Sequence, residues 1–419
     1  MDFFSTLHIL GQAFYHTWWI ILPTTLYYLL KILWKDFVFI ASPHSYFRTF
    51  SWTVLEVIPP REIEKGPKLM ESIFQGMSGV TTNYNTFDIW TKGMLIQDRF
   101  SFELVGDGGQ AHFYIRVMKK HRSLIEAQIY AQYPAAEIME VEDYTKNFPK
   151  VAPNRDWDLW GTDFEFTAPP PYPIKTYDKF EEDITGTMID PIAALVEVIG
   201  ALPPDQHIWL QYIVEPLPEK WNYDAAHLKI LDKLRGREKA PDMGIGGHLL
   251  DVLKNVIGAM FKPPEFATPA KKEEQPLEFR LSPLEKDILK SVEENLGRYT
   301  YQTKMRFILI GRRETFQKPL VSAFIGAIKQ FNDMNYNQVK PQDASKTYGK
   351  IFFTKAIGDY RKRKLYRRYR DRNPDGVKVF FSTKELATVF HFPDMNVQSP
   401  AVLRVASKMG TAPPNLPIR

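Results

Sequence analysis

Residues 99–144 read RFSFELVGDGGQAHFYIRVMKKHRSLIEAQIYAQYPAAEIMEVEDY, and this stretch decides the expected fold. Apolar and polar side chains alternate at 100–105 and again after the turn, which predicts two strands. The Asp-Gly-Gly at 107–109 predicts a hairpin, because glycine accepts the positive φ of tight turns. A helical period follows at 119–133, and 138–141 resume an extended pattern. This order is typical of the second half of a ferredoxin-like βαββαβ unit.

The residues before this stretch supply the first half of the unit. Residues 52–58 predict a strand that ends at a Pro-Pro pair. Residues 67–77 predict a helix with a proline in its first turn, where the missing N–H costs nothing. We therefore expect residues 46–145 to form a first ferredoxin-like domain.

A similar order of elements recurs later in the chain. The pattern predicts a helix that begins at Asp190, strands at 207–214 and 302–310, a helix at 316–331 and a last strand at 350–353. Aspartate is a preferred residue at a helix N-terminus, and a proline follows it here. We expect these elements to build a second ferredoxin-like domain.

Further segments surround the second domain, which we place at residues 186–355. A Pro-rich connector at 146–185 is expected to contribute edge strands. A helical insertion at 215–299 separates the two middle strands, and its stretch 243–262 is amphipathic. The last segment, 356–419, predicts a basic helix followed by an extended, proline-rich tail.

The N-terminal residues 1–45 predict a transmembrane anchor. The run 9–30 is almost uncharged and reaches the ~20 residues that a spanning helix needs. Lys31 and Lys35 follow it, so the positive-inside rule places the N-terminus outside and the bulk of the chain in the cytoplasm. An amphipathic helix lying in the membrane interface is the alternative. The expected fold class is α+β, with this transmembrane helix followed by two ferredoxin-like domains.

Motifs for catalysis, cofactors and metals are missing from the sequence. The chain has no cysteine, which excludes disulfides, thiolate metal sites and thiol nucleophiles. It has no P-loop signature, no G-x-S-x-G and no H-E-x-x-H. The paired carboxylates stand in loops or at helix ends, where they are usually solvated. We therefore predict no catalytic, cofactor-binding or metal-binding residues, and no enzyme.

Residues 359–372, DYRKRKLYRRYRDR, predict a basic helix with tyrosines at helical spacing. We expect Tyr360, Leu365, Tyr366 and Tyr369 to pack inward while the cations point outward. The net charge of the whole chain is only +5, so this local cluster of cations matters more than the average.

The cations of this helix are the candidate contacts for a nucleic acid or an anionic lipid. Anionic lipid would attract them at about 1 kcal/mol per cation, and a nucleic acid through counterion release. A solvated helix without any ligand is the third interpretation. The candidate contact residues are Arg361, Lys362, Arg363, Lys364, Arg367, Arg368, Arg370 and Arg372.

Four segments carry a resemblance to a known family, namely 108–144, 190–202, 320–332 and 381–417. They resemble the N-terminal, membrane-proximal region, a domain of unknown function, of type IV secretion-like conjugative DNA-transfer ATPase proteins of small-genome candidate-phylum bacteria. After the position of 413–417 the longer proteins continue into a P-loop ATPase domain, whereas this chain stops. The resemblance therefore implies an ATPase supplied by another polypeptide, and it transfers no catalytic residue.

The resulting hypothesis is a non-enzymatic, membrane-anchored adaptor or scaffold subunit of a type IV secretion-like machine, located in the cell membrane as a single-pass protein. Its expected partners are the membrane and a P-loop translocation ATPase in trans. Nucleic acid, anionic lipid and self-association stay open. The alternative hypothesis is a membrane-associated nucleic-acid-binding protein that uses the basic helix at 361–372.

Overall fold

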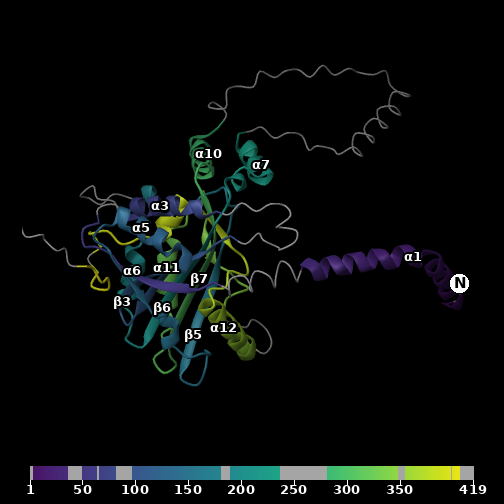
Figure 1. Ribbon diagram of the computed structural model, residues 1–419, viewed down its shortest axis with the longest axis horizontal. Coiled ribbons are helices and arrows are strands. Elements are labelled where there is room, and N and C mark those ends of the chain that lie inside the picture. Colours follow the sequence, from purple (N-terminus) through teal and green to yellow (C-terminus); the bar gives the residue numbers. More distant parts are fainter. Residues whose placement is uncertain are drawn as a thin grey trace, which may run out of the picture.

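The computed structural model describes residues 3–35, 50–63, 66–81, 97–180, 189–235, 281–347, 354–397 and 399–405. In these residues the chain is α+β, and nine strands form one antiparallel sheet with the order β4-β1-β3-β2-β6-β7-β5-β8, in which β9 pairs with β7 (Figure 1).

The first half of the sheet follows the order expected from the sequence pattern. Its strands are arranged β4-β1-β3-β2, which is the order of a ferredoxin-like unit. The hairpin between β2 and β3 turns through Gly108 and Gly109, whose φ values are +53° and +91°. Glycine adopts such φ values without the steric cost of a Cβ, so it suits this turn, and the turn fixes the register of the hairpin. The elements are β1 (Trp52–Ile58), α3 (Gly66–Met77), β2 (Phe100–Asp107), β3 (Gln110–Met118), α5 (Arg122–Gln132) and β4 (Glu137–Val141).

The second half has the mirrored order β6-β7-β5-β8. Its first strand, β5, has ten residues and lies between β7 and β8, so the connector supplies an inner strand and not the short edge strands that were expected. The outermost strand of this half is β8. The strand predicted at 350–353 lies outside the described residues. The elements are β5 (Trp157–Phe166), α6 (Ala193–Gly200), β6 (Gln206–Pro216), β7 (Thr300–Arg312), α11 (Pro319–Lys329), β8 (Val339–Pro341) and β9 (Val379–Ser382).

The two halves share one sheet and one core. Strand β2 pairs with β6 along its whole length, from Phe100 opposite Val214 to Asp107 opposite His207. The largest apolar cluster contains buried side chains from both halves, for example Phe113 of β3 and Phe307 of β7. Pairing at β2 and β6 removes the two inner sheet edges, which would otherwise expose unpaired backbone groups.

Helices cover the two faces of the sheet unequally. Helices α3, α5, α6 and α11, together with α13 (Thr383–Val389), pack on one face and bury Leu104, Leu210 and Phe307. The opposite face carries the next residues along the same strands, such as Trp209 and Ile308, and packs against α12 (Thr354–Arg370) (Figure 1). Because successive strand residues point to opposite faces, covering both faces leaves β2 and β6 almost wholly buried.

The residues after β9 run back across the first half of the sheet. The backbone N–H of Ala111 donates to the carbonyl of Ala401 at 2.7 Å, and Arg404 donates to the carbonyl of Arg61 at 3.0 Å. The predicted extended tail therefore begins as a segment held against its own domain. Its continuation from residue 406 lies outside the described residues.

The insertion between β6 and β7 contributes a pair of helices, α7 (Ala225–Leu234) and α10 (Pro283–Leu296), which project from the body in Figure 1. Helix α10 begins with a capping box: the Ser282 hydroxyl accepts from the Glu285 N–H, and the Glu285 carboxylate accepts from the Ser282 N–H. The amphipathic stretch predicted at 243–262 lies outside the described residues.

The N-terminal helix α1 (Phe3–Lys35) corrects the membrane prediction. Of the helices that the structure describes, none combines the length and the apolar composition that crossing a membrane requires. Helix α1 is long, but its Trp, Tyr, Thr, His and Gln side chains lower its mean hydropathy below that of a spanning helix. The predicted transmembrane anchor was therefore wrong, and with it the fold class as stated and the single-pass location in the cell membrane.

Candidate functional site

Helix α12 rests on the sheet through three of its four expected inward positions. Leu365, Tyr366 and Tyr369 are buried beneath it, and the two tyrosine rings lie against Trp209 of β6, with ring centroids 6.0 and 5.1 Å away. The prediction for Tyr360 was wrong, since 63% of this side chain is exposed. An aromatic ring therefore stands among the outward-facing cations.

A row of polar side chains crosses the sheet on the face that α12 covers. Glu103 of β2, Gln211 of β6, Arg306 of β7 and Asp163 of β5 are paired in register on neighbouring strands. All four are buried. The sequence showed them as isolated polar residues within apolar strands, and only the pairing of the strands brings them together.

Asp163 lies between two buried cations. Its carboxylate is 2.7 Å from the Lys304 ammonium and 2.8 Å from the Arg306 guanidinium. Burial by itself would raise the pKa of Asp163, but the charges of Arg306 and Lys304 outweigh it and hold that pKa below its usual value. The carboxylate is therefore ionised and neutralised, and it adds no accessible negative charge beside α12.

Arg372 lies two residues after the end of α12 and is buried. Its guanidinium donates to both carboxylate oxygens of Glu103 at 3.0 Å and to both of Asp143 at 2.5 and 3.0 Å. The residue is 1% exposed and has a φ of +47°, an unusual backbone conformation for a side chain with a Cβ. Burial favours the neutral form of Glu103, yet the charge of Arg372 keeps the pKa of Glu103 below its usual value. This contact is structural, so we exclude Arg372 from the surface that a ligand could reach.

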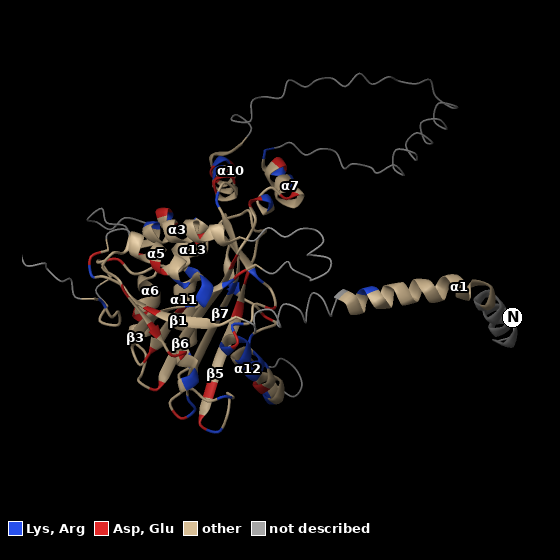
Figure 2. Ribbon diagram, viewed as in Figure 1, with Lys and Arg blue, Asp and Glu red and all other residues tan. Residues whose placement is uncertain are grey.

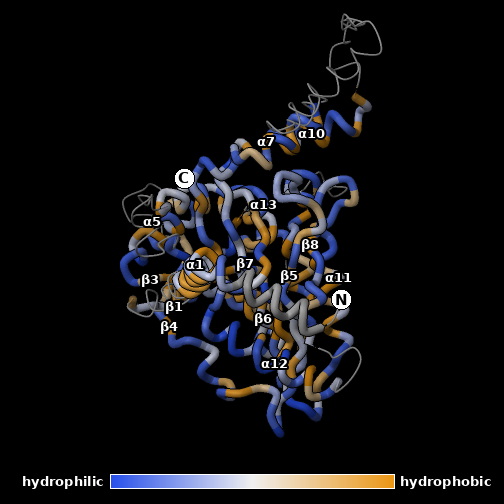
Figure 3. The backbone as a smooth tube through the Cα atoms, turned by 90° about the vertical axis from the view of Figure 1, so that its right-hand side faces the viewer, coloured by the Kyte–Doolittle hydropathy of each residue, from blue (hydrophilic) through white to orange (hydrophobic). Residues whose placement is uncertain are grey.

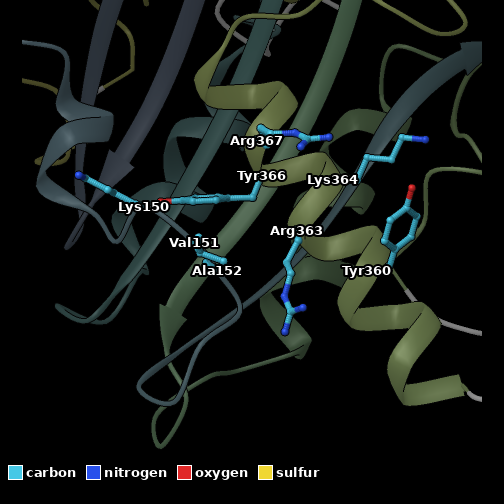
Figure 4. Close-up of a pocket in the computed structure, with 8 residues that line it drawn as sticks. All are labelled: Lys150, Val151, Ala152, Tyr360, Arg363, Lys364, Tyr366 and Arg367. Carbon is cyan, nitrogen blue, oxygen red and sulfur yellow. The ribbon is translucent and has the colours of Figure 1, made fainter.

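The outward side of α12 forms one wall of a basic groove. Arg363, Lys364 and Arg367 line it together with Tyr360, and Lys150 contributes from the segment beside the helix (Figure 4). The groove has a volume of about 340 Å³. Spacings of three and four residues place these four helix positions along one side of α12.

A second groove of about 430 Å³ runs along the other side of the helix. It is lined by Arg361 and Arg368, and it shares Tyr360 and Lys364 with the first groove. Asp163 also borders this groove, but its charge is neutralised as described above. Figure 2 shows how Lys and Arg gather along α12 on this side of the body.

Three of the remaining predicted cations, besides Arg372, have partners within the protein. Lys362 is 2.6 Å from the Asp158 carboxylate, Arg370 donates to the carbonyl of Pro149, and Arg361 donates to the carbonyl of Lys346. By contrast, within the described part of the chain no carboxylate forms an ion pair with any of the four cations of the first groove.

Sequence reasoning missed Lys150 as a member of this groove. It lies in the Pro-rich connector, about 200 residues from α12, and nothing in its sequence neighbourhood links it to the helix. The link is tertiary: the Tyr366 hydroxyl donates to the carbonyl of Pro149 at 2.7 Å, which holds the connector against the helix.

The chemistry available at this site is that of anion binding. Guanidinium groups donate paired hydrogen bonds to phosphate oxygens, and ammonium groups add a compact charge. Among the described residues, no group of three or more His, Asp or Glu side chains is arranged to hold a metal ion. The site therefore has donors and positive charge for an anionic ligand.

The chain belongs to the family defined by a domain of unknown function (DUF8128), whose match covers residues 47–404. No curated protein matches the chain. The family covers the whole sheet, α12 and both grooves, whereas all of α1 precedes it.

Proposed function

We propose that this protein is a non-enzymatic nucleic-acid-binding protein that holds a phosphate backbone in the basic groove along α12. One observation carries the proposal. Arg363, Lys364, Arg367 and Lys150 line a single groove, and no described carboxylate pairs with any of them. A phosphate backbone supplies repeated negative charges, and its counterions are released when cations replace them.

The arrangement of charge on α12 supports the same conclusion. Arg363 and Arg367 are four residues apart, as are Lys364 and Arg368, so like charges face each other on the helix surface. Each such pair destabilises a helix by roughly 0.2–0.5 kcal/mol. A bound polyanion would turn this repulsion into attraction, whereas a helix that merely faces solvent gains nothing from it.

We expect the double variant Arg363→Gln/Arg367→Gln to bind nucleic acid more weakly. Each lost phosphate contact lowers the steepness of the salt dependence by about 0.9 for duplex DNA, so the double change should lower it by about 2. Affinity at moderate salt should fall roughly tenfold. The measurement is fluorescence anisotropy of labelled oligonucleotides over a series of salt concentrations.

The matched control is Lys286→Gln/Lys290→Gln on α10, which removes two exposed cations at the same four-residue spacing. It should bind like the unmodified protein. Equal binding by the two double variants would remove α12 from the proposal. Binding to vesicles of anionic phospholipid, with no binding to oligonucleotides, would replace nucleic acid by a lipid surface.

We propose, as a second candidate, an adaptor that carries a P-loop translocation ATPase supplied in trans, as the sequence resemblance implies. The observation that favours it is α1, which extends from the body (Figure 1) and is coloured largely as hydrophobic along its backbone (Figure 3). Its residues from Tyr15 to Trp34 are exposed. Trp18 and Trp19 are 49% and 62% exposed. Contiguous exposed apolar surface of this kind is typical of a protein-protein contact.

We expect full-length protein isolated from its own cells to retain a P-loop ATPase, identified by mass spectrometry. The variant Trp18→Ser/Trp19→Ser should lose most of it, because the apolar contact is removed. The control Tyr223→Ser/Met334→Ser changes two exposed side chains on the body and should retain it. An isolate without any P-loop ATPase, or equal recovery by both variants, would reject this role for α1.

A further inference from the structure

Tyr360 is the feature of the basic surface that phosphate binding alone does not use. It is a large aromatic side chain with 63% of its surface exposed, and it borders both grooves beside α12. Lys364 lies 6.0 Å from its ring centroid, at the outer limit of a cation-π contact. The other two tyrosines of α12, Tyr366 and Tyr369, are instead buried against the sheet.

The two grooves together surround this ring with cations. Arg363 and Arg367 line the first groove, Arg368 lines the second, and Lys364 lines both. Their volumes, about 340 and 430 Å³, fall in the range of pockets that take small ligands. An exposed aromatic ring between cationic grooves is the arrangement with which proteins bind single-stranded nucleic acid: the bases stack on the ring and the backbone follows the charge.

The position of α12 in the fold argues against a duplex. Its inner face, with Leu365, Tyr366 and Tyr369, is buried on the sheet. Residues 150–152 border the helix on one side, and Gln342, Ser345 and Gly376 border it on the other. A helix that reads duplex DNA enters a major groove about 12 Å wide, which requires it to project from its own domain. Here α12 lies between two grooves instead.

We propose that this site binds single-stranded nucleic acid, with one base stacked on Tyr360 and the adjacent phosphates held by Arg363 and Lys364. The proposal rests on the nucleic-acid binding proposed above and specifies its ligand class. Bases of a duplex are stacked inside the helix and cannot reach an aromatic side chain, whereas bases of a single strand can. Stacking tolerates every base, so recognition of sequence is not expected.

The test compares four proteins: the full-length chain, Tyr360→Ala, Tyr360→Phe and Arg363→Gln/Arg367→Gln. The probes are labelled oligothymidylate and oligouridylate of about 12 nucleotides, within the range of known single-strand sites, and a DNA duplex of the same length. Binding is measured by fluorescence anisotropy at equal salt concentration.

We expect the unmodified protein to bind the single strands more tightly than the duplex. Tyr360→Ala should weaken single-strand binding at least about fivefold, because a stacked base is lost. Tyr360→Phe keeps the ring and should stay within about twofold of the unmodified protein, and neither change should alter duplex binding. The affinities for oligothymidylate and oligouridylate show whether the site prefers single-stranded DNA or RNA.

The possible failures are distinct. Equal binding of duplex and single strand, or unchanged single-strand binding by Tyr360→Ala, overturns the stacking proposal. If Arg363→Gln/Arg367→Gln then still binds every probe more weakly than the unmodified protein, the proposed nucleic-acid binding stands and only the stacking on Tyr360 is rejected. If the unmodified protein binds no oligonucleotide, both proposals fail together.

Discussion

The variant Arg372→Met is expected to lose about 3–5 kcal/mol of unfolding free energy, the cost of breaking a buried ion pair from one side. The Arg372 guanidinium neutralises Glu103 and Asp143 at once, and the Glu103 side chain is wholly buried. Methionine has a similar length but no charge, so it would leave these carboxylates without their cation. Both residues carry a Cβ, so the unusual φ at this position does not differ between them. Urea denaturation followed by circular dichroism measures the loss.

The matched control is Arg367→Met, which makes the same chemical change on the exposed side of α12. Exposed substitutions of this kind usually change stability by less than about 0.5 kcal/mol. Adding Glu103→Gln to Arg372→Met should recover part of the loss, because it removes the buried charge that was left unpaired. A single variant as stable as the unmodified protein would show that this contact does not hold α12 in place.

The strands and helices of the sheet were largely readable from local pattern. The hairpin at Gly108 and Gly109 and the alternation in the strands on either side of it depend on neighbouring residues alone. The pairing of β2 with β6 was not readable, because it joins residues about 110 apart and leaves no trace in either strand by itself. The expectation of two separate ferredoxin-like domains therefore became one continuous sheet.

The candidate site shows the same division between local and long-range signals. Helical spacing correctly placed Leu365, Tyr366 and Tyr369 inside. It does not place Tyr360 with them, because Tyr360 lies three and four residues from Arg363 and Lys364 and therefore shares their outward side of the helix. It also could not reveal that Arg372 is buried, since an arginine with two distant carboxylate partners looks like any other cation of a basic run.

The apolar N-terminal stretch shows why composition alone misled the membrane prediction. Few charges interrupt the helix, but an uncharged residue is not always apolar enough for a bilayer core. Thr24 and Thr25 donate their hydroxyls to the carbonyls of Ile20 and Ile21, which satisfies these groups within the helix without making it more apolar. Whether a helix is apolar enough to cross a membrane depends on its mean hydropathy and not on the absence of charge alone.

The second large effect is expected from pH and concerns Glu385. This carboxyl is fully buried at the start of α13, and burial raises its pKa from 4.5 to about 7, although it accepts hydrogen bonds from the N–H groups of Ser382 and Ile174. Between about pH 4.5 and 7, Glu385 is therefore protonated in the folded state and ionised in the unfolded state. The stability contributed by this group is full below pH 4.5 and is lost as the pH rises through 7. We expect the unfolding free energy to fall by roughly 2–3 kcal/mol from pH 5 to pH 8, at ~1.4 kcal/mol per pKa unit.

Glu385→Gln should flatten this dependence, because an amide stays neutral at every pH. Its single oxygen can accept from only one of the two N–H groups that bond to Oε1 and Oε2, so the variant is also expected to be less stable by an amount that does not depend on pH. Urea midpoints at pH 5, 6, 7 and 8 measure the effect. The structure offers a matched control in Glu285, which holds the same place in the capping box of α10 but is exposed, and whose pKa is lowered by its hydrogen bonds to Ser282. Glu285→Gln should therefore keep the slope of the unmodified protein. If Glu385→Gln keeps that slope too, the falling stability belongs to other groups, and burial of Glu385 does not set its protonation in this range.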